Sequence, residues 1–393
     1  MTHRIVFLID SFTGPWAGTE RQLWHLMQGL DRQRFAPHLV LLRHSDYSLQ
    51  ARDWPCPVDV IGIERLASPA GLWGLLRLAR LLRRLDARVV HAFFQDASLL
   101  GPVAARLAGA RFVAGRRDMG IWYNPANLRL LRLSSRLVDG VIANSKAVQA
   151  LVAREEHIAA SRISVIRNGL EPPASPGVVD LPGDIPAGAP VIGIVANLRP
   201  VKRHADLIRA FAGVRRTLPD AHLVIVGEGG LEGELRQLAA AEGVGSNTHF
   251  LGRIEEPVGV IRRFTVAALC SESEGLSNAL MECLREGKPA VCTDVGGNPE
   301  LVTAGSNGFL YPVGNVDDLT RHLLRLLTDP GLLREMSAAA VRSVAAMTIE
   351  NMVEKHMLSY ETLLQAASRQ GGLIEEDGGR QVGAGCTKGK EHT

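Results

Sequence analysis

Short apolar runs that read as strands alternate with helical patterns along most of this 393-residue chain. The alternation is clearest over residues 268–303, which read as strand, loop, helix, strand, glycine loop and the start of another helix. Strands that alternate with helices build a doubly wound parallel sheet, so we expect an α/β protein. A chain of this length is too long for one compact core and is expected to form two domains.

Two carboxylates in this stretch are candidates for binding a ligand. Glu274 lies in a glycine-containing loop, and Glu282 lies about one turn into the following helix, which Ser277 or Asn278 can cap. A loop carboxylate can accept hydrogen bonds from vicinal sugar hydroxyls, a helix carboxylate can bind a ribose diol, and free amides at the helix start suit phosphate. Together these groups describe a nucleotide-sugar site. The alternative is an ordinary solvated helix with a capped start.

Two further loops suit an anion. Gly296 and Gly297 lack side chains, so backbone amides can approach a ligand, and Pro299 stands at the first position of the next helix. Arg199 and Lys202 lie in an earlier strand-to-helix loop, where two cations can neutralise a leaving diphosphate without a metal. The alternative for this pair is plain surface charge.

The stretch over residues 268–303 resembles the nucleotide-sugar half of family-four retaining glycosyltransferases of the bacterial type, the glycosyl transferases group 1 with the GT-B fold. The departures from the family pattern are Ser277, where Pro is usual, and Cys283, where Ala is usual. The residues that match it are Glu274, Gly275, Glu282, Gly287, Pro289, Gly296, Gly297 and Glu300.

This resemblance covers roughly residues 4–367. It implies two Rossmann-like domains whose parallel sheets face each other across a cleft, with a last helix that crosses back to the first domain. The segment over residues 17–21 is similar to the family's G-G-x-E-R loop, and Arg199 with Lys202 matches its R-x-x-K. The resemblance implies a catalytic role for Glu274, Lys202 and Arg199. It implies donor contacts for Glu282, Gly18, Arg253, Ile254, Gly275, Leu276, Ser277, Asn278, Gly296, Gly297 and Glu300.

Three residues of the first domain are candidates for contacting an acceptor. His91 closes a strand at its carboxyl end, where open α/β sheets bind ligands, and Arg117 follows the next strand in the same manner. The family often has H-x-H at the first of these positions, but Phe93 stands here in place of the second histidine. Asp96 is the nearest alternative carboxylate. A structural role is the alternative for the histidine and for the arginine.

The resemblance implies an enzyme that transfers a sugar from a nucleotide diphosphate sugar, with UDP or GDP as the nucleotide, to a glycan or lipid-linked acceptor. Polysaccharide or glycolipid biosynthesis is the expected setting. The family retains the anomeric configuration by same-face attack assisted by the leaving phosphate, so no general base is required. The chain has no D-x-D motif, so neither a metal nor another cofactor is expected.

Three other functions remain open at this point. A nucleotide-sugar epimerase of the same fold would use the same donor half, and a catalytically inactive sugar-nucleotide-binding protein would need no acceptor. A Rossmann oxidoreductase is disfavoured because the glycine motif over residues 227–233 is incomplete.

The first part of the chain is strongly basic. Residues 1–168 contain 23 Lys and Arg residues against 13 Asp and Glu residues, whereas the whole chain has a net charge of only +3. By charge alone the partner is an anionic lipid, an anionic acceptor or nucleic acid. We expect an anionic membrane surface and no nucleic acid, with a solvated surface as the alternative. Two predicted helices carry Arg77, Arg80, Arg84, Arg129, Arg132 and Arg136.

Composition divides the chain into five parts. We expect a first domain over residues 1–170, a proline-rich linker over 171–190, a second domain over 191–345, a helix over 346–368 and a disordered tail over 369–393. No apolar run approaches membrane-spanning length, so we expect a cytoplasmic protein, peripheral at the inner face of the cytoplasmic membrane. The five cysteines show no metal-ligand spacing and are expected to stay reduced.

Overall fold

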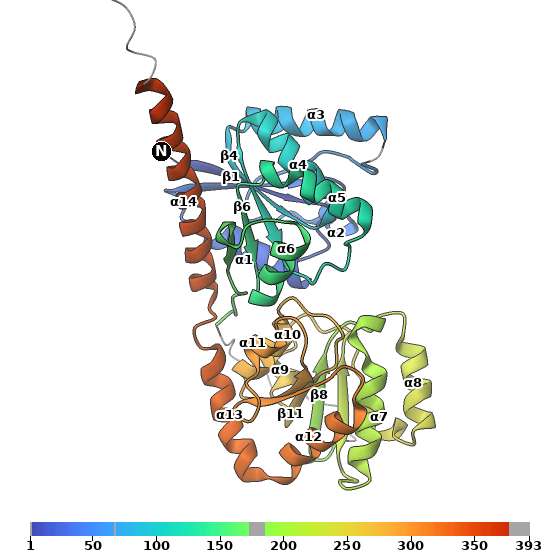
Figure 1. The fold of residues 1–393 in the computed structure, drawn as a ribbon. Coiled ribbons are helices and arrows are strands. Elements are labelled where there is room, and N and C mark those ends of the chain that lie inside the picture. Colours follow the sequence, from blue (N-terminus) through green and yellow to red (C-terminus); the bar gives the residue numbers. More distant parts are fainter. Residues whose placement is uncertain (1, 67, 173–184, 377–393) are drawn as a thin grey trace, which may run out of the picture.

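The computed structural model describes residues 2–66, 68–172 and 185–376, which form two α/β domains and a long C-terminal helix (Figure 1). Every strand pair in the two sheets is parallel. Parallel neighbours require crossover connections, and helices supply them in both domains. The predicted class, two Rossmann-like domains of the GT-B type, is confirmed.

The first domain is built on a seven-stranded sheet with the order β3-β2-β1-β4-β5-β6-β7. Its strands are β1 His3–Ile9, β2 Phe35–Leu41, β3 Val58–Val60, β4 Ala87–Phe93, β5 Arg111–Arg116, β6 Gly140–Ala143 and β7 Ile163–Val165. Its helices are α1 Gly18–Gly29, α2 Asp46–Gln50, α3 Pro69–Arg84, α4 Gln95–Ala108, α5 Pro125–Ser134 and α6 Lys146–Glu155.

The sequence of β1 explains why this sheet is buried on both faces. Side chains alternate between the two faces of a strand. Val6 and Leu8 accordingly pack in one buried cluster, whereas Ile5, Phe7 and Ile9 pack in another. A strand that is apolar on both faces needs helices on both sides, which is the layering observed.

The second domain is built on a six-stranded sheet with the order β10-β9-β8-β11-β12-β13. Its strands are β8 Val191–Val195, β9 His222–Val226, β10 Thr248–Phe250, β11 Val266–Leu269, β12 Ala290–Thr293 and β13 Gly308–Tyr311. Its helices are α7 His204–Arg215, α8 Glu232–Ala241, α9 Val258–Ile261, α10 Asn278–Arg285, α11 Asn298–Leu301, α12 Val316–Thr328 and α13 Pro330–Val344.

The last helix, α14 Ile349–Glu376, returns to the first domain, as predicted (Figure 1). Met352, Val353 and Tyr360 are buried in the same apolar cluster as Phe7 and Phe35. The helix continues to Glu376, past residue 368, where the sequence placed its end. Most of the predicted linker, residues 173–184, and residues 377–393 of the predicted tail lie outside the described residues.

Candidate active site

A cleft of about 760 Å³ lies between the domains, lined by loops that follow strands of both sheets. Parallel strands end at the same edge of a sheet, so loops from β1, β8 and β11 converge there. Of the predicted site residues, those that border the cleft are Gly18, Arg117, Arg199, Lys202, Arg253, Ile254, Glu274, Leu276, Ser277, Asn278 and Glu282.

The predicted catalytic carboxylate and cation contact each other. The Nζ atom of Lys202 lies 2.5 Å from Oε1 of Glu274, and the Ser271 hydroxyl donates to the same oxygen over 2.7 Å. Lys202 ends a short 3₁₀ helix after β8, and Glu274 follows β11, the neighbouring strand. Arg199 lines the same cleft, so its lining includes two cations and the Glu274 carboxylate.

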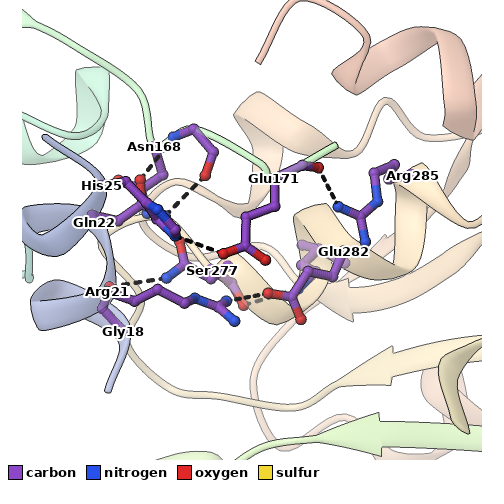
Figure 2. A network of polar contacts seen from close by, with 12 residues as sticks. Gly18, Arg21, Gln22, His25, Asn168, Glu171, Ser277, Glu282 and Arg285 are labelled. Carbon is purple, nitrogen blue, oxygen red and sulfur yellow. Dashed lines mark hydrogen bonds and ion pairs between the residues drawn. The ribbon is translucent and has the colours of Figure 1, made fainter. Parts of the chain in front are cut away.

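Helix α10 presents the second predicted carboxylate. Ser277 caps this helix by accepting a hydrogen bond from the Leu280 amide (3.2 Å), so of the two candidates it is the cap. Glu282 is only 5% exposed and forms an ion pair with Arg21 of α1 (Figure 2). Arg21 belongs to the first domain, so this pair joins the domains across the cleft. No role for Arg21 was predicted from the sequence.

A series of hydrogen bonds fixes Gly18 at the edge of the cleft. Arg117 donates to Oδ1 of Asn168 (2.5 Å), Asn168 donates to Oδ1 of Asn278 (2.5 Å), and Asn278 donates to the Gly18 carbonyl (3.1 Å). Burial lowers the pKa of the Arg117 guanidinium to about 10, although the charge of Glu20 acts in the opposite direction. Because Asn278 is in the second domain, this series also depends on the contact between domains.

Helix α1 also contacts the segment that leaves the first domain. Gln22 exchanges two hydrogen bonds with the backbone of Gly169, of 2.9 and 2.8 Å. His25 Nε2 lies 2.8 Å from a Glu171 carboxylate oxygen, and Arg285 of α10 donates to the Glu171 carbonyl over 2.7 Å. Figure 2 shows these contacts converging between α1 and α10.

The predicted donor-binding glycines Gly275, Gly296 and Gly297 do not border the cleft. A Cβ atom at Gly296 would lie 1.7 Å from the Glu274 carbonyl oxygen, and one at Gly297 would lie 2.2 Å from that of Gly275. A Cβ atom at Gly275 would lie 2.1 Å from the Arg117 carbonyl oxygen. The glycines permit the predicted close approach, but the approaching group in this structure is protein backbone.

Glu300 also lies elsewhere than predicted. It accepts hydrogen bonds from the backbone amides of Lys146 (2.6 Å) and Ala147 (3.2 Å), and it forms an ion pair with Arg167 (2.8 Å). An acidic side chain at a helix N-terminus is favourable because the free amides there carry partial positive charge. The structure therefore assigns Glu300 to the contact between α11 and α6 in place of the cleft.

Two predicted acceptor residues are engaged elsewhere. His91 is fully buried, and its Nδ1 atom lies 2.8 Å from the Tyr360 hydroxyl of α14. Burial, and then the charges of His356 and Arg117, hold the pKa of His91 well below its usual value. Asp96 forms an ion pair with Arg43 and does not border the cleft. Of the three acceptor candidates, only Arg117 reaches the cleft wall.

Glu20 is a cleft carboxylate for which no role was predicted from the sequence. It is 6% exposed, accepts a hydrogen bond from the Thr13 hydroxyl (2.8 Å) and borders the cleft from the first domain. Burial raises its pKa, while the Thr13 hydrogen bond and the charge of Arg117 act against that rise. Its place in the segment over residues 17–21, beside Gly18, was the signal available in the sequence.

Two family models match the chain, one for each domain. Residues 16–172 match Glycosyltransferase Family 4, and residues 182–343 match Glycosyl transferases group 1. The two matches together extend over most of the chain.

Individual relatives agree with these matches. N-acetyl-alpha-D-glucosaminyl L-malate synthase of Bacillus anthracis is 32% identical over 169 residues, which are 43% of this chain and 43% of that protein, so less than half of its length is matched. The UDP-Gal:alpha-D-GlcNAc-diphosphoundecaprenol alpha-1,3-galactosyltransferase of Escherichia coli is 26% identical over 285 residues, which are 67% of this chain and 72% of that protein.

Solved structures show the same fold. The crystal structure of Anabaena HepE in complex with UDP matches with a TM-score of 0.77 at 22% identity, covering 91% of this chain and 100% of that one. With a family match on each domain and this architecture, the chain belongs to family four of the glycosyltransferases, and its fold is GT-B.

Proposed function

We propose that this protein transfers a sugar from a nucleotide diphosphate sugar to a glycan or lipid-linked acceptor, with retention of anomeric configuration. One observation carries the proposal: Lys202 pairs with Glu274 in an interdomain cleft that Arg199 and the capped N-terminus of α10 also line. Two cations and free helix amides suit a diphosphate, and a carboxylate between them suits sugar hydroxyls.

Each group then has a task in the transfer. Lys202 and Arg199 stabilise the charge that develops on the leaving diphosphate as its bond to the anomeric carbon breaks. The acceptor oxygen forms its bond to that carbon on the same face, and the acceptor proton passes to a leaving phosphate oxygen. Glu274 orients the sugar through its hydroxyls. Glu20, on the opposite wall of the cleft, accepts a hydrogen bond from a neighbouring hydroxyl of the acceptor, which orients the attacking hydroxyl toward the anomeric carbon.

The donor also competes for a group that is already paired. Glu282 is proposed to bind the ribose diol, yet it forms an ion pair with Arg21. Removing one partner from a buried ion pair is costly, so Arg21 needs a replacement anion when ribose arrives. The donor diphosphate is that anion, since Arg21 borders the same cleft.

We propose a UDP-sugar as the first donor to test and a lipid-linked saccharide as the acceptor. The named reaction of the Escherichia coli relative has a UDP-sugar donor and a diphosphoundecaprenol-linked acceptor, and HepE was crystallised with UDP. The basic first domain favours an acceptor at an anionic membrane surface. The structure describes no helix that is both long and apolar enough to span a membrane.

The test is to incubate the protein with UDP-sugars and GDP-sugars, with and without lipid-linked acceptors, and to measure nucleotide release and the identity of the sugar. A transferase releases nucleoside diphosphate mainly when acceptor is present, and the product keeps the anomeric configuration of the donor. Conversion of the donor sugar without acceptor would show an epimerase. Binding without either change would show an inactive sugar-nucleotide-binding protein.

A further inference from the structure

Aromatic side chains form a cluster on the first domain, next to the cleft. Phe12, three residues after the end of β1, lies 5.1 Å from Trp54, 5.7 Å from Tyr47 and 5.9 Å from Trp24 between ring centroids. Tyr47 in turn lies 5.3 Å from Trp16, edge to face at 89°. The cluster holds three of the five tryptophans of the chain, and Trp16 is the member that borders the cleft.

The position of the Trp16 ring is fixed by its surroundings. Gly14 has a φ of +144°, and a Cβ atom there would lie 2.2 Å from Cζ2 of Trp16, so the indole packs directly on the glycine backbone. The Ala17 amide closes this turn by donating to the Gly14 carbonyl (3.2 Å). Gly14 below and Tyr47 at the edge hold the ring, while 38% of Trp16 stays exposed.

Arg253, from the second domain, lies over the face of the Trp16 ring. Its guanidinium carbon lies 4.3 Å from the centroid of the Trp16 ring, a cation–π contact that crosses the cleft. Two carboxylates accompany this arginine: Glu228 at 3.6 Å and Glu255 at 3.4 Å. These carboxylates are 61% and 69% exposed, so water reaches this part of the cleft and can solvate a guanidinium that leaves the indole.

This part of the cleft differs from the rest in chemistry. Charged groups that suit phosphate and sugar line the region of Lys202 and Glu274. Arg253, which contacts Trp16, is followed in the chain by Ile254, and Ile254 and Pro257 add apolar surfaces to the lining of the cleft. A planar, weakly polar group fits such a lining, and of the parts of a nucleotide sugar only the base has that character.

We propose that the exposed face of Trp16 is the stacking surface for the base of the donor, and that Arg253 occupies this surface until the nucleotide displaces it. A guanidinium and a nucleobase are both planar and both stack on an indole. Because Gly14 and Tyr47 fix the ring, the arginine moves and the tryptophan stays. The first domain then contributes directly to donor binding. This inference rests on the proposed function, since it takes the ligand to be a nucleotide.

The experiment measures binding of UDP, GDP and inorganic pyrophosphate by calorimetry to the wild type, Trp16→Leu, Trp16→Phe and the control Trp73→Phe, whose indole is exposed on α3. Stacking of a base on an aromatic ring predicts that Trp16→Leu weakens UDP or GDP binding about tenfold or more. Trp16→Phe retains most of the affinity. Pyrophosphate has no base, so its affinity is unchanged in every variant.

Tryptophan emission gives a second readout. Binding of UDP or GDP should change the tryptophan emission of the wild type and of Trp73→Phe, but not that of Trp16→Phe. Binding of pyrophosphate should leave the emission of all three proteins unchanged. Equal nucleotide affinity of Trp16→Leu and the wild type would overturn the stacking role and leave the proposed function standing. A wild type that binds neither UDP nor GDP would instead refute a UDP-sugar or GDP-sugar as the donor, and with it the stacking of their bases on Trp16.

Discussion

The Nζ atom of Lys202 lies 2.5 Å from Oε1 of Glu274, and the Glu274 side chain is only 10% exposed. We expect Lys202→Ala to lower transfer by roughly 100-fold or more, because it removes a preorganised cation from the developing charge of the leaving group. Glu274→Gln should also abolish transfer, since it removes the carboxylate that orients the sugar. Turnover and circular dichroism are measured for both variants, with the exposed Lys355→Ala on α14 as the control. Near-normal turnover of Glu274→Gln would remove the role assigned to Glu274.

Metal independence is a second prediction at the residue scale. The chain has no D-x-D motif, and Arg199 and Lys202 are placed to neutralise the diphosphate. We expect turnover to stay unchanged in excess chelator. A loss that magnesium or manganese restores would show that a divalent cation shares this task with the two side chains.

Some of these residues could be predicted from the sequence, and the reason is topological. Arg199 and Lys202 follow β8 while Glu274 follows β11, and neighbouring parallel strands bring their following loops together. Arg21 and Trp16 could not be assigned, because their partners, Glu282 and Arg253, belong to the other domain. Local periodicity contains no information on how two domains face each other.

At the scale of elements, buried imidazoles lie where α14 packs against the first domain. His356 donates from Nδ1 to the Met352 carbonyl (2.8 Å), and His91 contacts the Tyr360 hydroxyl. Burial, with a smaller contribution from the charge of Arg117, lowers the pKa of His356 to about 4. In the unfolded chain an imidazole has a pKa of about 6.5. Between these two values the unfolded state binds more protons than the folded state.

Acidification from pH 7 should therefore destabilise the fold. The free energy of unfolding falls as the pH drops below 6.5, and at pH 5 the loss due to His356 is roughly 2 kcal/mol. The variant His356→Gln keeps a hydrogen-bond donor but does not titrate, so its stability should depend less on pH over this interval. Urea unfolding of the wild type, His356→Gln and the exposed control His44→Gln at pH 7, 6 and 5 measures the effect. If the free energy of unfolding depends on pH equally in all three proteins, the role assigned to His356 is wrong.

Element boundaries were predictable where the chain marks them. Helix α12 begins at Val316, directly after an asparagine, and the Asn315 side chain caps it by accepting from the Asp318 amide (3.0 Å). The end of α14 was not marked in this way. The composition after residue 368 indicated only that no core could form there. A helix needs no core to continue, because its backbone hydrogen bonds are internal, and α14 extends to Glu376.

At the scale of the whole molecule, helices α3, α4 and α5 form one outer face of the first domain (Figure 1). Large apolar side chains are exposed on it, with Leu72 at 62%, Trp73 at 63% and Leu133 at 78%. Arginines lie among them, and those of α3 line a shallow pocket of about 300 Å³ beside β3: Arg77, Arg80 and Arg84. Exposed apolar groups interleaved with arginines are typical of a helix that lies in a membrane interface.

The predicted arginines do not all contribute equally to this face. Arg132 of α5 donates to the Glu155 carbonyl (2.7 Å) and lies 3.7 Å from its carboxylate, so its charge is already paired. Asp59 also borders the α3 pocket and weakens its positive potential. The sequence pattern identified the basic helices, but only the fold shows which arginines have a nearby carboxylate.

We predict that this face binds anionic membranes, because each arginine near such a surface contributes about 1 kcal/mol. The wild type should co-sediment with vesicles of anionic lipid at low salt, should bind neutral vesicles less, and should dissociate as salt screens the charges. Arg77→Glu combined with Arg80→Glu should abolish sedimentation. The same charge change on α13 of the second domain, Arg334→Glu combined with Arg342→Glu, should leave it in place. If the α3 and α13 variants lose binding equally, net charge governs association and the face has no special part in it. If the wild type stays in solution with anionic vesicles at low salt, the face is a solvated surface, and a soluble acceptor becomes the better proposal.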